Sequence, residues 1–225
     1  MRAIRAAWAL AGKDLRVEAR AREAFATMLF FAALVLLVFN FALEPGSAAL
    51  REAAGGLLWV AFLFTGMLAL ARSFQAERES ECLEALVLSP APREAIFFGK
   101  FAGNLVVMLA AEALILVLFA VLQNLDVWGA LPQLALVGFL GTVGFAAVGT
   151  LVAAMASSLR AREVLLPLLL IPLVVPVVLG AVRATEAVLA PGGMAGWGPW
   201  LQLLAVFDAM FLAVCPLVFE FVVEG

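Results

Sequence analysis

Six long apolar segments, nearly free of charge, occupy most of this 225-residue chain and limit its fold more than any other feature. Each has about 18 to 26 residues, enough for a helix to cross a hydrocarbon core of about 30 Å. A soluble domain of this size has too little interior to hide so much apolar surface. The sequence therefore predicts an all-α integral membrane protein. We place its six transmembrane helices at about 24–43, 54–71, 101–122, 131–156, 164–182 and 200–222.

The positive charges orient these spans. All of the 14 Lys and Arg residues except Arg51 and Arg183 lie in the leading segment, the second connection or the fourth connection. Connections rich in Lys and Arg stay in the cytoplasm, so both termini are predicted to be cytoplasmic. Residues 1–225 then form a single transmembrane domain. Its basic edge suits anionic lipid headgroups and requires no nucleic acid.

The leading segment, residues 1–23, has the pattern of an amphipathic helix. Its apolar side chains recur at helical spacing, with basic residues on the other faces. We expect an interfacial helix on the inner surface of the membrane. A plain charged anchor that only sets topology remains the alternative. The apolar positions are Ile4, Trp8, Ala11 and Leu15, and the charged ones of interest are Lys13, Asp14, Glu18 and Arg20.

Missing residue types exclude several kinds of chemistry. The chain has no histidine, which excludes Ser–His catalysis and His-ligated zinc or heme. The closest approach to a Walker phosphate loop ends in Gly99-Lys100, but Glu94 replaces its first glycine and Phe101 its Ser/Thr. We therefore expect no metal site and no directly bound cofactor. Cys215-Pro216 is expected to be a buried thiol beside a helix kink rather than a heme ligand.

Two spans carry polar side chains that are costly in lipid. Glu112 lies near the middle of the third span and Asp208 within the sixth. Such groups should face protein or water, and either a functional carboxyl or a structural hydrogen bond explains Glu112. An aspartyl-protease pair is not expected, because the in-span acids Glu112, Asp208 and Glu220 are predicted at different depths. The fourth span is rich in glycine, which favours close packing against neighbouring helices or against a second copy in a homodimer.

Residues 72–100 form the longest cytoplasmic connection. Within it, 77–90 combines acidic residues with a short leucine stripe, and Pro90 ends the pattern. A helix this acidic suits a groove on a protein partner better than an anionic membrane surface, although a solvated acidic loop is the alternative. We predict that 72–100 is a coupling region. Its expected contact residues are Glu77, Glu81, Leu83, Glu84, Leu86 and Pro90.

Several motifs together resemble the CcmB family, the membrane permease subunit of the ABC-type cytochrome c maturation system. The resemblance runs along nearly the whole chain and is most specific in three places. These are Lys13-Asp14-Leu15 with Glu18 and Arg20, Gly56-Leu57-Leu58-Trp59-Val60, and the block from Arg72 to Lys100, which includes Leu83-Glu84-Ala85-Leu86, Ser89-Pro90 and Gly99-Lys100.

This resemblance implies an ABC-2-like permease fold in the bacterial cytoplasmic (inner) membrane. A separate ABC ATPase subunit would bind ATP, and a heme-handling membrane protein and a small accessory subunit would complete the complex. Heme would be a substrate of that complex, and this chain would be a transporter subunit and not an enzyme. Other readings are a proton-coupled secondary transporter using Glu112, an intramembrane enzyme, and a scaffold that assembles heme proteins without transport. An ATPase that copurifies with the chain, and whose activity the chain changes, would separate them.

Overall fold

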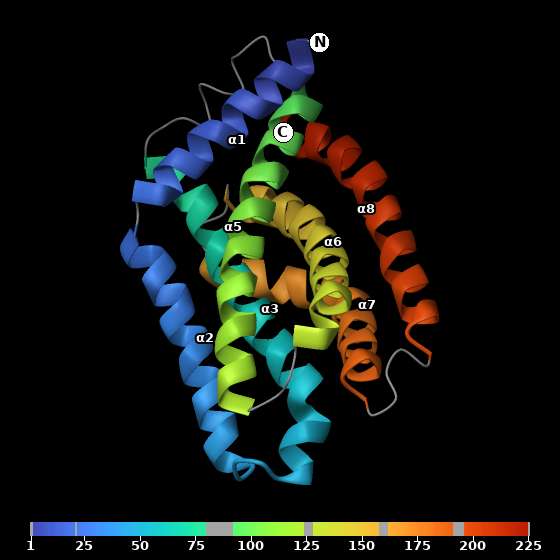
Figure 1. The fold of residues 1–225 in the computed structure, drawn as a ribbon. Coiled ribbons are helices and arrows are strands. Elements are labelled where there is room, and N and C mark those ends of the chain that lie inside the picture. Colours follow the sequence, from blue (N-terminus) through green and yellow to red (C-terminus); the bar gives the residue numbers. More distant parts are fainter. Residues whose placement is uncertain are drawn as a thin grey trace.

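The computed structural model of the chain describes residues 2–20, 22–79, 92–123, 128–157, 162–190 and 196–224, and all its regular elements are helices (Figure 1). Six of these helices are long and apolar enough to cross a membrane. The predicted all-α, six-span fold is confirmed. The helices are α1 (Arg2–Arg20), α2 (Arg22–Ala42), α3 (Ala48–Glu79), α5 (Arg93–Gln123), the short 3₁₀ helix η1 (Trp128–Ala130), α6 (Leu131–Ser157), α7 (Arg162–Leu189) and α8 (Gly198–Glu224).

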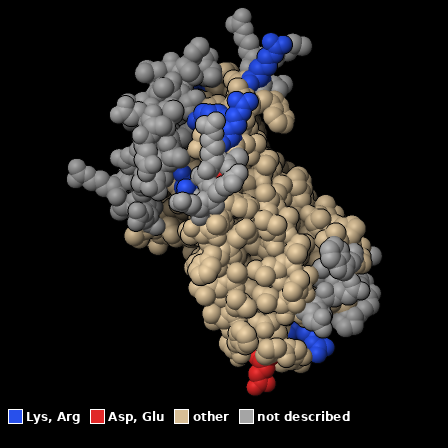
Figure 2. Space-filling model, turned by 60° about the vertical axis from the view of Figure 1, so that its left-hand side comes forward, with Lys and Arg blue, Asp and Glu red and all other residues tan. Residues whose placement is uncertain are grey.

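The spans alternate in direction, so both termini lie at the same end of the bundle (Figure 1). We call this the basic end, because Arg72 at the end of the apolar part of α3 and Arg93 at the start of α5 also lie there. On the face shown in Figure 2, a belt without charged side chains separates Lys and Arg at this end from a few charges at the opposite end. This arrangement fits a protein surrounded by lipid at its middle.

Several helices extend past their predicted spans. α3 begins at Ala48, where the Ser47 hydroxyl accepts a hydrogen bond from the Leu50 amide at 3.0 Å. α5 begins directly after Pro92, whose carbonyl accepts from the Ala95 amide at 2.9 Å. The apolar run marks only the part of a helix that lipid surrounds. Charged turns beyond it remain helical because caps and neighbouring helices stabilise them.

α6 is the central helix of the bundle. It contacts α3, α5, α7 and α8, and every residue from 141 to 150 is buried. Its glycines allow this close approach: a Cβ on Gly141 would overlap the Trp59 ring, and one on Gly149 would overlap Leu70. The predicted tight packing of the fourth span is confirmed, and its partners are helices of the same chain.

The apolar interior has a cluster in the half near the basic end and another in the half near the opposite end. The first includes Phe97, Phe219 and Cys215, and the second includes Ile115 and Leu204. Cys215 is 2 % exposed and carries a free thiol. The prediction of a buried thiol next to Pro216 is therefore confirmed.

Candidate functional site

α1 lies across the basic end and packs mainly on the first turns of α5 (Figure 1). Leu10 and Ala11 are buried in this contact. α5 presents Gly99, where an added Cβ would come 2.8 Å from the Leu10 Cβ, and Gly103, where it would come 3.3 Å from the Asp14 Cβ. The two helices touch closely because α5 has no side chain at these positions.

The apolar stripe predicted for α1 does not form one face. Trp8 is 74 % exposed, while Ala11, from the same stripe, is 3 % exposed. The buried face instead runs along Ala7, Leu10, Ala11 and Asp14, which recur at the spacing of a helix contact. The amphipathic helix itself is confirmed. Its inner face binds protein, which leaves Trp8 on the side that an interfacial helix would turn toward lipid.

A buried ion pair fastens this contact. The Lys100 Nζ of α5 lies 2.9 Å from Asp14 Oδ2, and Lys13 lies 3.3 Å from Oδ1 of the same carboxylate. Lys100 is only 2 % exposed, and its ammonium also lies 5.4 Å from the centre of the Phe74 ring near the end of α3. Removing one partner from such a pair leaves a buried charge, which is far more costly than losing a surface contact. The pair therefore joins α1, α3 and α5 at one point.

Glu18, one turn beyond Asp14, extends this cluster toward Arg72. Burial raises the pKa of the Glu18 carboxyl above its usual 4.5, and the positive charge of Arg72 offsets part of this rise. Its Oε1 is buried without a hydrogen-bond partner among the described residues. We call Asp14, Glu18, Arg72, Phe74 and Lys100 the basic junction.

A second polar site lies inside the bundle. Glu112 of α5 points toward α6, where the Thr142 hydroxyl donates a hydrogen bond to its Oε1 at 2.5 Å. The same hydroxyl lies 2.8 Å from the Gly138 carbonyl oxygen. Because a hydroxyl has one hydrogen, both contacts are full hydrogen bonds at once only when the carboxyl is protonated. Glu112 therefore faces protein, as predicted for a carboxyl within a span.

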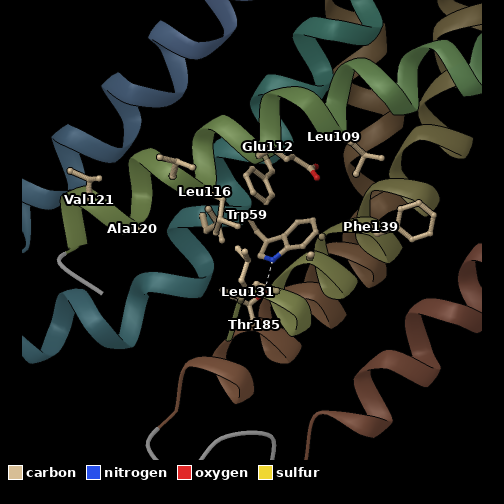
Figure 3. A pocket seen from close by; sticks show the side chains of 16 residues that line it. Trp59, Leu109, Glu112, Leu116, Ala120, Val121, Leu131, Phe139 and Thr185 are labelled. Atoms are coloured by element: carbon tan, nitrogen blue, oxygen red, sulfur yellow. Dashed lines mark hydrogen bonds between the residues drawn. The ribbon is translucent and has the colours of Figure 1, made fainter. Parts of the chain in front are cut away.

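A cavity of about 480 Å³ lies beside Glu112, between α5 and α6 (Figure 3). Trp59 and Phe62 of α3 lie at its inner wall, and Thr185 of α7 also borders it. The Trp59 indole donates a hydrogen bond to the Thr185 hydroxyl at 2.9 Å, which fixes the ring against the cavity. Apart from the groups named here, the described walls are aliphatic or aromatic.

Asp208 of α8 contacts the other side of α6. It is 5 % exposed, and a Cβ on Gly144 would lie 2.6 Å from its Oδ1. Glu112 lies beside Gly138 and Thr142 of α6, whereas Asp208 lies beside Gly144. Thr142 and Gly144 point roughly 200° apart around the helix axis, so α6 itself separates the two carboxyls. They form no catalytic pair.

The predicted coupling residues are only partly visible. Glu81, Leu83, Glu84, Leu86 and Pro90 lie outside the described residues, and Glu77 belongs to the last turns of α3 with only its backbone described. Arg20 likewise ends α1.

The sequence did not identify Thr142, Thr185 or the burial of Lys100. Hydropathy counts Lys100 as a loop charge, and the pairing with Asp14 depends on how α1 folds back.

Comparison with known proteins places this geometry in a family. The family model described as CcmB protein matches residues 5–224, which include every described site residue. The chain belongs to the CcmB family. It is 32 % identical over 200 residues to Heme exporter protein B of Pseudomonas aeruginosa, which covers 88 % of this chain and 89 % of the relative.

Two further relatives have the same name. Heme exporter protein B of Rhodobacter capsulatus is 34 % identical over 168 residues, covering 75 % of this chain and 77 % of the relative. The protein of that name from Paracoccus denitrificans is 32 % identical over 210 residues, covering 92 % and 94 %. With its six spans, this CcmB-family chain is a multi-pass protein of the bacterial inner membrane.

Proposed function

We propose that this chain is the membrane-spanning subunit of an ABC-type heme exporter, and that it converts the movement of a separate ATPase into movement of its helices. The relatives named Heme exporter protein B support the heme-export part. The sequence has no phosphate-binding loop of its own, which supports an ATPase in another chain. The subunit itself is then a transporter component and not an enzyme.

The basic junction is the observation that carries the coupling part of this proposal. Lys100 is the eighth residue of α5 and the last residue of the 72–100 region, and Asp14 of α1 pairs with it. Since both charges are largely buried, a force on α1 is transmitted to α5 instead of being lost by sliding. α1 and the first turns of α5 therefore move as one body.

The acidic segment 77–90 is the proposed ATPase contact. It connects α3 and α5. Lys100 belongs to α5, and its ammonium group lies over the Phe74 ring of α3. Leu83 and Leu86 would enter a groove on the ATPase, with Glu77, Glu81 and Glu84 around them. Binding there would act on both helices at once.

The other components follow from the same family. A heme-handling membrane protein and a small accessory subunit complete the proposed complex, and heme is its substrate. Heme ligation is assigned to the partners, because this chain has no histidine and its Cys215 is buried in the apolar interior.

Copurification tests the proposal. The double variant Leu83→Asp with Leu86→Asp should lose the ATPase while the chain still inserts in the membrane, because neither residue belongs to a span predicted from the sequence. The matched control is Pro45→Asp with Gly129→Asp, which adds the same charges at exposed positions of the opposite end, outside the candidate spans. The control should retain the ATPase and its regulation.

Two results would contradict this function. If the ATPase binds the Leu83/Leu86 variant as well as the original chain, segment 77–90 is not the contact. If an ATPase binds but its activity is the same with and without this chain, the chain is a scaffold. Loss of heme export in a Glu112→Gln variant with normal ATPase coupling would instead favour a proton-driven carrier.

A further inference from the structure

The cavity between α5 and α6 opens toward the lipid. Its edge is formed by residues that stay exposed within the spans: Val117 is 54 % exposed, Val121 73 % and Phe139 45 %. From there it extends inward to Trp59, which is 4 % exposed. Because the opening lies in the apolar part of the two helices, a molecule enters it from the hydrocarbon and not from water.

The walls select against charge. The described lining residues are apolar or aromatic except Glu112, Thr185 and the indole nitrogen of Trp59, and none of them is Lys or Arg. An anionic group inside would meet a carboxyl and no positive partner, which is costly at low dielectric. The Trp59 and Phe62 rings of the inner wall and Phe139 at the edge suit a flat, aromatic body.

The polar groups of the cavity also determine which hydrogen bond a ligand can form there. The Trp59 N–H is already given to Thr185, and Glu112 Oε1 is held by Thr142. Glu112 Oε2 lies on the side of Gly138, a lining residue whose added Cβ would be 3.8 Å away from it. With the carboxyl ionised, or with its proton on Oε1, Oε2 is an acceptor. The cavity thus offers an acceptor, and a ligand would supply the donor.

We propose that this cavity binds an uncharged aromatic hydrophobe that dissolves in the bilayer and donates one O–H or N–H to Glu112 Oε2. Its volume of about 480 Å³ falls within the range of small-molecule sites. The proposal does not depend on heme export or on the ATPase. It depends only on the position of the opening within the membrane spans, the aromatic walls and the single acceptor, Glu112 Oε2.

A matched pair of photoreactive probes tests it. One is a diazirine-bearing hydrophobic phenol and the other its methyl ether, which keeps the body and loses the donor. Both are added to membranes that contain the full chain, and labelled peptides are mapped by mass spectrometry. We expect the phenol to label the lining parts of α5 and α6 about tenfold more than the ether, as for one hydrogen bond of about 1.4 kcal/mol.

Variants separate the donor contact from simple filling of the cavity. Glu112→Leu should remove the preference for the phenol. Gly138→Leu fills the space beside Glu112 and should lower labelling by both probes. Gly56→Leu is the control, because its added Cβ meets nothing within 4 Å and Gly56 is not a lining residue.

Three outcomes would overturn the proposal. Equal labelling by phenol and ether would mean that the cavity takes acyl chains without a polar contact. Unchanged labelling in Gly138→Leu would place the probe outside the cavity. Stronger labelling by a carboxylate analogue of the probe would show that the site selects anions. A loss of phenol preference in Glu112→Leu, with Gly56→Leu unaffected, would support the proposal.

Discussion

One helix, α5, has two very different environments along its length. At the basic end it touches α1 so closely that Gly99 leaves no room for a methyl group, and Lys100 is paired with Asp14 in near-complete burial. In the outer half it borders an open cavity, where Gly138 of the facing helix has ordinary space around it. The first region is built to hold two helices together and the second to leave space between two helices.

The two proposed roles, transmission of movement and binding of a ligand, thus fall on opposite halves of a single span. A buried ion pair stabilises one arrangement of the two helices, and any shift that separates the charges leaves them buried without compensation. Such a contact suits transmission of movement. An apolar cavity with one acceptor tolerates changes of volume, which suits an exchangeable ligand. The same kind of substitution should therefore change stability differently at the α1–α5 contact and at the cavity.

Breaking the ion pair should have the largest effect. Asp14→Ala leaves Lys100 buried with Lys13 as its neighbour, and we expect a loss of about 3–5 kcal/mol of stability. The measurement is thermal unfolding of the purified chain in detergent. Asp14→Leu combined with Lys100→Met should recover most of the loss, because it removes both charges. Equal damage in the single and double variants would show that packing, not the charge pair, holds the junction.

The second largest effect should be a difference in stability between two Gly→Ala variants, one in each region. Gly99→Ala places a Cβ 2.8 Å from the Leu10 Cβ and 3.0 Å from the Ala7 carbonyl oxygen, so we expect a cost of about 1–3 kcal/mol. Gly138→Ala meets only Glu112 Oε2 at 3.8 Å and gains helix propensity, so it should be neutral or stabilising. A comparable loss in both variants would contradict the contrast between a tight and an open region.

Two threonines inside the bundle, of which Thr185 borders the cavity, offer a finer comparison. Thr185→Val removes the acceptor of the Trp59 indole and should cost about 1 kcal/mol. The Thr65 hydroxyl is buried without a hydrogen-bond partner among the described residues, so Thr65→Val should cost nothing or stabilise. Unfolding in detergent measures both. Destabilisation by Thr65→Val alone would mean that an ordered water occupies the site.

Glu18 should give the smallest effect, visible as a pH dependence. Since burial raises its pKa, the folded chain binds this proton more tightly than the unfolded chain does, and stability falls as pH rises from about 4.5 through the raised pKa. Glu18→Gln removes this loss, so the variant should gain on the original chain between pH 4.5 and pH 8. The exposed Glu52→Gln is the control. A gain at pH 4.5 that disappears at pH 8 would reverse the assigned sign.

The sequence predicted the spans well and the contacts poorly, and physics explains both. An apolar run long enough to cross lipid is a local property, and so is the amphipathic pattern of α1. The pairing of Lys100 with Asp14 depends on α1 folding across the bundle, and residues 86 positions apart have no periodic signal. The placement of Glu112 and Asp208 on opposite sides of α6 was not predicted for a similar reason: a sequence shows how far a residue lies from the end of its span, but not which side of a neighbouring helix it meets.

A covalent lock between α1 and the first turns of α5 tests most directly whether the two helices move as one body, as proposed. Ala11→Cys with Gly103→Cys, in a chain with Cys82→Ser and Cys215→Ala, places two thiols across the contact where the Gly103 Cβ would lie 4.0 Å from the Ala11 Cα. ATP-dependent heme delivery by the proposed complex is then measured with the disulfide formed and reduced. We predict equal delivery in both states, because the lock adds nothing that the junction does not already hold. Delivery that stops on oxidation and returns on reduction would show that α1 slides on α5 and would contradict the claim.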